Sequence, residues 1–170
     1  EAWVYHNIPS SGMGTEGPAG NYNRTRFLHE PDTGSSIGVK PPGDTIARTT
    51  FDQRSRPTGT WVGANDFNFG SVNFSTSGTS NLVQVNASEY DDGDDGGDDN
   101  VTMSVAYVDA AGGSERETTF EYDYRNRQEM VFVTDGTYTT YTKTTYDNLD
   151  QAVVVERFEH PTMGSDVLIG

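Results

Sequence analysis

The pattern of hydrophobic and polar positions predicts β-strands through most of the second half of the chain. In the segment 101–108, Val101, Met103, Val105 and Tyr107 alternate with smaller or polar residues, so these four side chains share one face of a strand. Tight turns separate this strand from those that follow, which gives an antiparallel meander of about five strands. The predicted strands are 101–108, 119–124, 129–134, 138–146 and 152–158. Apolar residues do not recur every 3.6 positions in any segment, so we expect no long helix.

The first part of the chain has a different pattern. A strand-like run at 3–8 is followed by a long stretch rich in Gly and Pro, with one further short strand at 45–51. We therefore predict an all-β fold: an antiparallel β-sandwich with a C-terminal meander and an irregular Gly/Pro-rich N-terminal arm. The arm and its loops occupy 1–57 and the main β body occupies 58–170 of a single domain. We find no sequence repeat with a period of 20–50 residues.

Composition limits the core and its chemistry. Only 32% of the 170 residues are hydrophobic, which predicts a thin core built from Val, Tyr, Phe and Trp. The chain contains no cysteine. This excludes a disulfide framework and a thiolate metal site.

The charge balance indicates a protein that folds in concentrated salt. The formal net charge is −15, and Lys40 and Lys143 are the only lysines. Repulsion among so many carboxylates destabilises a compact state, unless molar salt shortens the Debye length to about 3 Å. In this respect the chain resembles exported proteins of halophilic archaea or of their viruses. The resemblance is one of composition and names no single family, and it implies an extracellular location on a cell surface or a virion surface.

The same charge balance argues against two classes of partner. Nucleic acids and anionic membranes attract basic surfaces, whereas the arginines here are scattered. No apolar run approaches the roughly 20 residues of a membrane-spanning helix. The chain starts at Glu1 rather than Met, which indicates either a removed leader or a soluble fragment.

The most acidic stretch of the chain lies between two predicted strands. Its carboxylates could bind calcium as hard oxygen ligands. The alternative is a solvated loop tip held open by repulsion, since the spacing does not match the EF-hand pattern. The candidate ligands are Asp91, Asp92, Asp94, Asp95, Asp98 and Asp99.

Four Asn-x-Ser/Thr triplets are candidate N-glycosylation sites, at Asn23, Asn73, Asn86 and Asn100. Sugars at Asn86 and Asn100 would project beside the acidic loop. The alternative is that all four triplets are accidents of a chain rich in Asn, Ser and Thr.

Four further patterns carry little chemical weight. The Gly-rich motif at 12–17 and the Gly-x-Ser-x-Gly motif at 34–38 lack the strand and helix that their chemistry needs. Pro31 extends the backbone in 29–32, so His29, Glu30 and Asp32 would point apart. Glu121 and Asp123 share a strand face with other solvated residues, as in many acidic proteins. We therefore expect no enzymatic activity and no cofactor, with calcium as the one candidate ligand.

The aromatic residues supply either a core or a binding platform, and the sequence leaves both open. We expect the edge strand at the start of the chain to complete the sheet of a neighbouring subunit through Trp3, Tyr5 and Ile8. The predicted function is a structural subunit of a surface filament or virion that self-assembles into a homo-oligomer or polymer. The alternative is a carbohydrate- or calcium-binding module of a cell-surface adhesin. The β-rich head is similar to those of archaeal pilins and archaellins, but their apolar N-terminal helix is missing here.

Overall fold

The computed structural model describes residues 1–43, 45–66, 69–71, 80–93, 97–109, 114–134, 138–161 and 167–168. Apart from one short 3-10 turn, η1 (Asp91–Gly93), every regular element in these ranges is a β-strand. The predicted all-β class is therefore confirmed. The hairpin expected at Asp135-Gly136 lies outside the described residues.

The chain divides into two compact units, residues 1–84 and 85–170, called here the N-terminal unit and the C-terminal unit. In the N-terminal unit each strand pairs antiparallel with the next one along the chain. Its strands are β1 (Ala2–Tyr5), β2 (Tyr22–His29), β3 (Ser36–Lys40), β4 (Ile46–Phe51) and β5 (Pro57–Gly63).

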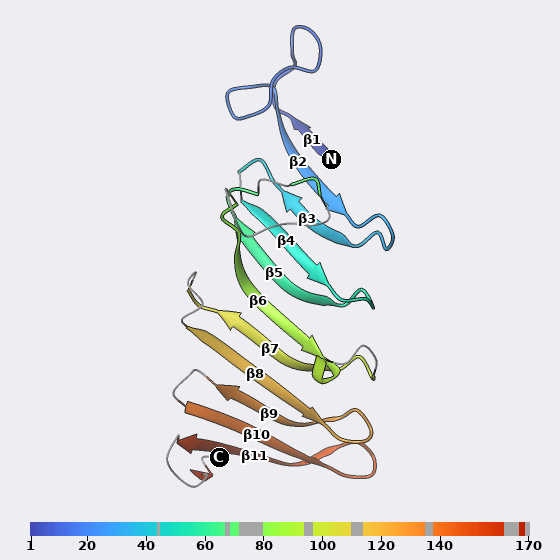
Figure 1. Ribbon diagram of the computed structural model, residues 1–170, viewed down its shortest axis with the longest axis vertical. Coiled ribbons are helices and arrows are strands. Elements are labelled where there is room, and N and C mark those ends of the chain that lie inside the picture. Colours follow the sequence, from blue (N-terminus) through green and yellow to red (C-terminus); the bar gives the residue numbers. More distant parts are fainter. Residues whose placement is uncertain are drawn as a thin grey trace. The chain divides into compact units, whose positions relative to one another are not determined.

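In the C-terminal unit the strands also follow one another in chain order, all antiparallel (Figure 1). β6 begins at the boundary between the units. The strands are β6 (Val83–Tyr90), β7 (Val101–Tyr107), β8 (Glu115–Tyr122), β9 (Gln128–Thr134), β10 (Tyr138–Tyr146), β11 (Ala152–Pro161) and β12 (Val167–Leu168).

Two features differ from the sequence prediction. The segment 1–57 holds four complete strands where an irregular arm was expected, because its Gly and Pro residues lie mostly in the turns between strands. Gly34, for example, has φ +72° in the β2–β3 turn, a conformation that glycine adopts without steric cost. The described strands of each unit form one sequentially paired sheet, so neither unit shows the second layer of a sandwich within the described residues.

Five connections between described strands share a recurrent turn that the sequence analysis missed. Each such turn starts with a ring-bearing residue followed by an acid, and the strand register shifts just before the ring. A residue with positive φ lies two positions before the next strand begins. The backbone N–H of the acid donates to the carbonyl of the residue after the positive-φ position. The five pairs are His29-Glu30, Phe51-Asp52, Tyr90-Asp91, Tyr122-Asp123 and Tyr146-Asp147.

This recurrence is one of structure and has no fixed period in the sequence. The repeated unit is a β-hairpin, and the spacing between turns varies because the connections between hairpins differ in length. Chains of this kind are stabilised by the contacts of each unit with its neighbours. The aromatic-acid pairs were the signal in the sequence, although they do not recur at a fixed period.

The N-terminal unit is centred on a buried ion pair. Arg48 on β4 donates from Nε to Asp66 Oδ2 over 2.7 Å, and both side chains are fully buried. Arg48 Nη2 also donates to the Ser71 carbonyl, and its guanidinium lies 5.4 Å from the centre of the Phe69 ring. Arg48 thereby holds Asp66, Phe69 and Ser71 against the sheet. Gly38 lies opposite Arg48 on β3, where an added Cβ would come within 3.1 Å of Arg48 Cδ.

Candidate functional site

The recurrent turns of the C-terminal unit all lie at the same end of its strands (Figure 1). The turns at 123–127 and 147–151 have the same internal bonding. In each, the Asp Oδ1 accepts the backbone N–H groups two and four residues later. Asx turns of this kind fix the path of the backbone without any contact to the rest of the sheet.

Arg127 ties its own turn together and then reaches the next one. Its Nε donates to Asp123 Oδ2 over 2.7 Å, and its Nη1 donates to Asp150 Oδ1 over 2.8 Å. The hydrogen bond from Arg127 holds the pKa of Asp123 at about 2, although desolvation acts in the opposite direction. The pKa of Arg127 is raised, chiefly by the same bond. Both groups stay charged at neutral pH.

A turn of the N-terminal unit contains the same hydrogen bond between an Arg and an Asp four residues before it. Desolvation acts to raise the pKa of Asp52, but the hydrogen bonds from Arg56 and Arg54 outweigh it and the pKa is lowered. Arg56 Nε donates to Asp52 Oδ2 over 2.6 Å. The Asp and Arg residues of these turns therefore serve the backbone fold.

The contacts between successive turns also repeat. The hydroxyl of Tyr122 donates to the Val101 carbonyl over 2.9 Å, and the hydroxyl of Tyr146 donates to the Gln128 carbonyl over 2.9 Å. Val101 and Gln128 occupy the same place, two residues after the positive-φ position of the preceding turn. Each turn is thus bonded to the next by an equivalent tyrosine.

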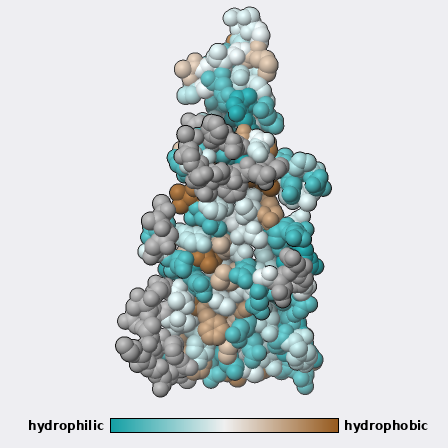
Figure 2. All heavy atoms as spheres, in the orientation of Figure 1, coloured by the Kyte–Doolittle hydropathy of each residue, from teal (hydrophilic) through white to brown (hydrophobic). Residues whose placement is uncertain are grey.

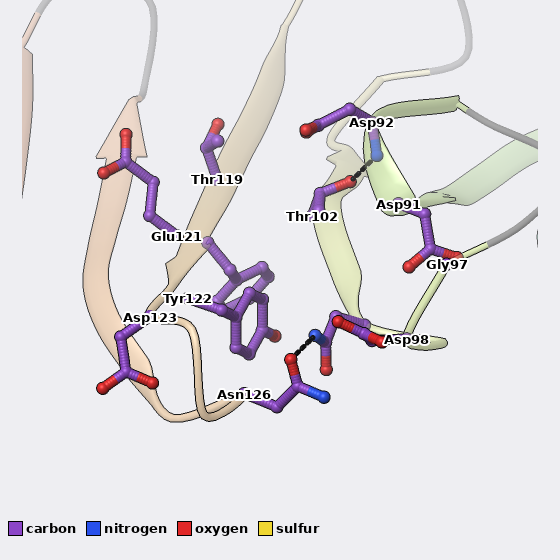
Figure 3. Close-up of a pocket in the computed structure, with 12 residues that line it drawn as sticks. Asp91, Asp92, Gly97, Asp98, Thr102, Thr119, Glu121, Tyr122, Asp123 and Asn126 are labelled. Carbon is purple, nitrogen blue, oxygen red and sulfur yellow. Dashed lines mark hydrogen bonds between the residues drawn. The ribbon is translucent and has the colours of Figure 1, made fainter.

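A pocket of about 660 Å³ opens between the β6–β7 and β8–β9 turns (Figure 3). Its wall includes the ring of Tyr122 and the side chain of Asn100, whose Nδ2 donates to Asn126 Oδ1 over 3.3 Å. The hydroxyl of Thr102 accepts the backbone N–H of Asp92. The lining residues are Asp91, Asp92, Gly97, Asp98, Asn100, Thr102, Thr119, Phe120, Glu121, Tyr122, Asp123 and Asn126.

The acidic loop is an enlarged form of the recurrent turn. In this turn, residues 92–98 separate the acid Asp91 from the positive-φ residue Asp99. In the β8–β9 turn, residues 124–125 alone separate Asp123 from the positive-φ residue Asn126. The N–H of Asp91 still donates to the Asn100 carbonyl over 3.0 Å, which closes the turn at its base. The base of this turn therefore has the same bonding as the bases of the shorter turns.

Of the predicted calcium ligands, the structure describes Asp91, Asp92, Asp98 and Asp99. Among the described residues, no three His, Asp or Glu side chains form a group that could hold a metal ion. Figure 3 shows the carboxylates of Glu121 and Asp123 on one side of Tyr122, and those of Asp91 and Asp92 on the other. Asp94 and Asp95 lie outside the described residues.

The candidate glycosylation sites lie in different surroundings. Asn23 is on β2 opposite Val4, which is exposed. Asn86 is on β6, and its Nδ2 donates to the Val105 carbonyl over 3.1 Å. Asn100 lies on the rim of the pocket. Asn73 is outside the described residues.

The residues predicted to bind a partner are only partly available. Trp3 and Tyr5 on β1 pack against the ring of Tyr22, with ring centres 4.6 and 5.3 Å away. Arg24 lies 5.5 Å from the centre of the Trp3 ring. Tyr5 remains half exposed, and Ile8, beyond the end of β1, is 96% exposed.

The comparisons with known proteins give no family. No protein-family model matches this chain, and no curated protein sequence matches it. A search of the described residues for a helix of the length and hydrophobicity needed to span a membrane finds none.

Proposed function

We propose that this protein is a structural subunit of an extracellular assembly, a surface filament or a virion surface, built through strand and sheet contacts. The observation that carries the proposal is the shallow burial of the C-terminal unit. Among its described residues Val105 alone is buried, whereas the N-terminal unit buries Ile46, Arg48 and Asp66 together with other residues. A sheet with so little of its surface covered gains stability when a neighbour covers it.

The surface that such a neighbour would cover is a row of half-buried apolar side chains. Residues directly opposite one another on paired strands share a face, and the register places Phe132, Tyr141 and Phe158 in one row across β9, β10 and β11. Their ring centres are 5.4 and 4.7 Å apart. The row continues through Thr119 and Met103 on β8 and β7. The sandwich predicted from the sequence enters the proposal here, with the second layer supplied by another subunit.

The surface composition supports a location outside the cell in strong salt. Hydrophilic residues occupy much of the face in view, and hydrophobic residues form separate patches between them (Figure 2). With a net charge of −15, two copies approach each other easily only where salt screens their repulsion. Glycans on the sequons belong to the same proposal.

We also propose that the protein has no enzymatic role. The support is that three of the polar contacts in the pocket hold the turns: Asp123 with Arg127, Asn100 with Asn126, and Tyr122 with Val101. A catalytic acid needs freedom to exchange a proton near neutral pH, and a carboxyl with a pKa of about 2 does not have it.

The pocket favours one second candidate, a carbohydrate- or calcium-binding module of an adhesin. Its wall joins amide, hydroxyl and carboxylate groups to the rings of Phe120 and Tyr122. This is a combination suited to the polar edges and apolar faces of a sugar. Calorimetric titration with calcium and with neutral oligosaccharides would support this candidate if either produced saturable heat.

Sedimentation velocity over a range of protein concentrations in molar NaCl tests the structural proposal. We expect the sedimentation coefficient to rise with concentration as assemblies form. A single monomeric species at every concentration, together with saturable sugar binding, would instead favour the adhesin module.

A further inference from the structure

The guanidinium of Arg127 lies in a site that two successive turns form together. In its own turn, Arg127 Nη2 lies 2.6 Å from Asp123 Oδ2. In the next turn, its Nη1 donates to Asp150 Oδ1 over 2.8 Å and to the Asp147 carbonyl over 3.1 Å. The ring of Tyr146 completes the site, with its centre 4.7 Å from the guanidinium carbon. A planar cation is thus held by carboxylates, a carbonyl and an aromatic face.

The recurrence of the turns places an equivalent site one repeat earlier, between the β6–β7 and β8–β9 turns. There Asp91 is the acid of the first turn, Tyr122 is the ring before the second turn, and Asn126 is the positive-φ residue of the second turn. The Asp123 carbonyl stands in the place of the Asp147 carbonyl, because both accept the backbone N–H three residues later. The four equivalents of the Arg127 site all line the pocket of about 660 Å³.

The residue that stands in the place of Arg127 in this earlier site is Asn100. It directly follows the positive-φ residue Asp99, as Arg127 follows the positive-φ residue of its own turn. Its Nδ2 donates to Asn126 Oδ1 over 3.3 Å, which matches the bond from Arg127 to Asp150. Asparagine is neutral and shorter than arginine, and none of the described residues that line the pocket is Arg or Lys. The site therefore keeps the surroundings of a guanidinium without a cation of its own.

We propose that this pocket binds the guanidinium group of a ligand, in the place that Arg127 occupies in the following repeat. The carboxylates of Asp91 and Asp98 give the lining its negative charge, and the ring of Tyr122 offers the face on which a planar cation stacks. The ligand differs from the sugar or calcium of the adhesin candidate. Its binding does not depend on the assembly of subunits, so each can fail without the other.

The acceptors of the pocket suit the several donors of a guanidinium. Asn126 Oδ1 accepts from Asn100, and the Asp123 carbonyl accepts a backbone N–H. A carbonyl oxygen has two lone pairs and can accept a second hydrogen bond. The Asp147 carbonyl does so in the later site, where it accepts both the backbone N–H of Asp150 and Arg127 Nη1. A guanidinium can therefore enter without breaking the bonds that hold the turns.

The test is an NMR titration of isotope-labelled protein with N-acetyl-arginine amide. The matched ligand is N-acetyl-citrulline amide, in which a neutral urea group replaces the guanidinium. At one NaCl concentration, we expect the arginine compound to shift the side-chain amide signals of Asn100 and Asn126 saturably. It should bind at least about tenfold more tightly than the citrulline compound, because charge-assisted hydrogen bonds are the stronger ones. Equal affinities, or no saturable shift at these signals, would overturn the proposal.

A variant that fills the pocket from within gives a second test. Asn100→Arg places a guanidinium where Arg127 has its own, and we expect it to weaken binding of N-acetyl-arginine amide by at least about tenfold. The matched control is Asn148→Arg, which adds the same charge at an exposed position of the β10–β11 turn and should bind as wild type does. Unchanged binding by a folded Asn100→Arg would overturn the site. If Asn100→Arg does not fold, the comparison of the two ligands on wild type decides.

Propylguanidinium distinguishes two sources of the ligand, because it carries the same group without peptide groups. Tighter binding of N-acetyl-arginine amide than of propylguanidinium would support an arginine side chain of another protein as the ligand. Tighter binding of propylguanidinium would support a small free alkylguanidine.

Discussion

Single residues in the turns carry much of the local order of this protein. Asp123 accepts two backbone N–H groups and the guanidinium of Arg127, which in turn reaches Asp150 in the following turn. The ring of Tyr146 lies 4.7 Å from the Arg127 guanidinium. One carboxylate therefore fixes its own turn and, through Arg127, the distance to the next.

Replacing Asp123 with Asn should destabilise the C-terminal unit, with an effect that depends on pH. The pKa of Asp123 is lowered to about 2 in the folded protein, from about 3.9 in an unfolded chain. The carboxylate therefore contributes its full stabilisation above about pH 4, and this contribution is lost as the pH falls towards 2. Thermal unfolding should show a gap between wild type and Asp123→Asn that closes over this range.

Asp32→Asn is the control for this prediction, because Asp32 is an exposed acid in the β2–β3 turn and the substitution removes the same charge. A gap between wild type and Asp123→Asn that stayed constant down to pH 2 would show that the carboxylate charge is not what stabilises the turn.

Breaking the buried ion pair between Arg48 and Asp66 should destabilise the N-terminal unit more than Asp123→Asn destabilises the C-terminal unit. Arg48→Met leaves Asp66 buried without its cation, which should cost about 3–5 kcal/mol of unfolding free energy. The double variant Arg48→Met/Asp66→Leu should recover much of this loss. Both tryptophans, Trp3 and Trp61, lie in this unit, so urea unfolding followed by tryptophan fluorescence measures it directly. A double variant as unstable as the single one would mean that the pair is needed for more than charge compensation.

At the scale of elements, the hairpin with its aromatic-acid turn is the building unit. The turns share a register shift, a positive-φ residue and one backbone hydrogen bond, although their sequences between the acid and the next strand differ. The acidic loop has the same base with a longer tip. The additional residues of the acidic loop therefore belong to its tip, and they are not needed to bring β6 and β7 together.

Replacing residues 92–98 with Tyr-Arg, the sequence at 124–125, should leave the C-terminal unit folded. A shorter loop lowers the entropy cost of closure by about 1 kcal/mol, and the loss of neighbouring carboxylates removes repulsion. The variant should melt at a higher temperature than wild type in dilute buffer, and the advantage should shrink in molar salt. Loss of the near-ultraviolet circular dichroism of the tyrosines would mean that the loop is required for folding.

The sequence predicted the strands in which apolar and polar side chains alternate. It missed the strands that can be recognised only from their hydrogen-bonded pairing with neighbouring strands. The strand expected at 138–146 is β10, with the same bounds. β2 and β3 were missed because the surrounding Gly and Pro residues suggested a loop, and only the register with β1 and β4 shows that these residues mark turns. The pocket was not predicted either, since Asn100 and Asn126 are distant in sequence and meet only when their turns stack.

For the whole molecule, the net charge predicts a strong dependence on salt. Raising NaCl from about 0.1 M to about 1 M shortens the Debye length from about 10 Å to about 3 Å and so weakens the repulsion among the acidic side chains. The melting temperature should rise steadily over this range. A melting temperature that stayed level or fell would contradict the proposed adaptation to brine.

If a neighbouring subunit completes the thinly covered sheet of the C-terminal unit, assembly should protect the backbone of that sheet from solvent. Hydrogen exchange followed by mass spectrometry, on dilute and on concentrated protein in molar NaCl, measures this protection. We expect backbone amides of β11 and its neighbours to gain protection as concentration rises, while those of β4 and β5 do not change. Equal protection of β11 at both concentrations, in a sample shown to be assembled, would contradict it.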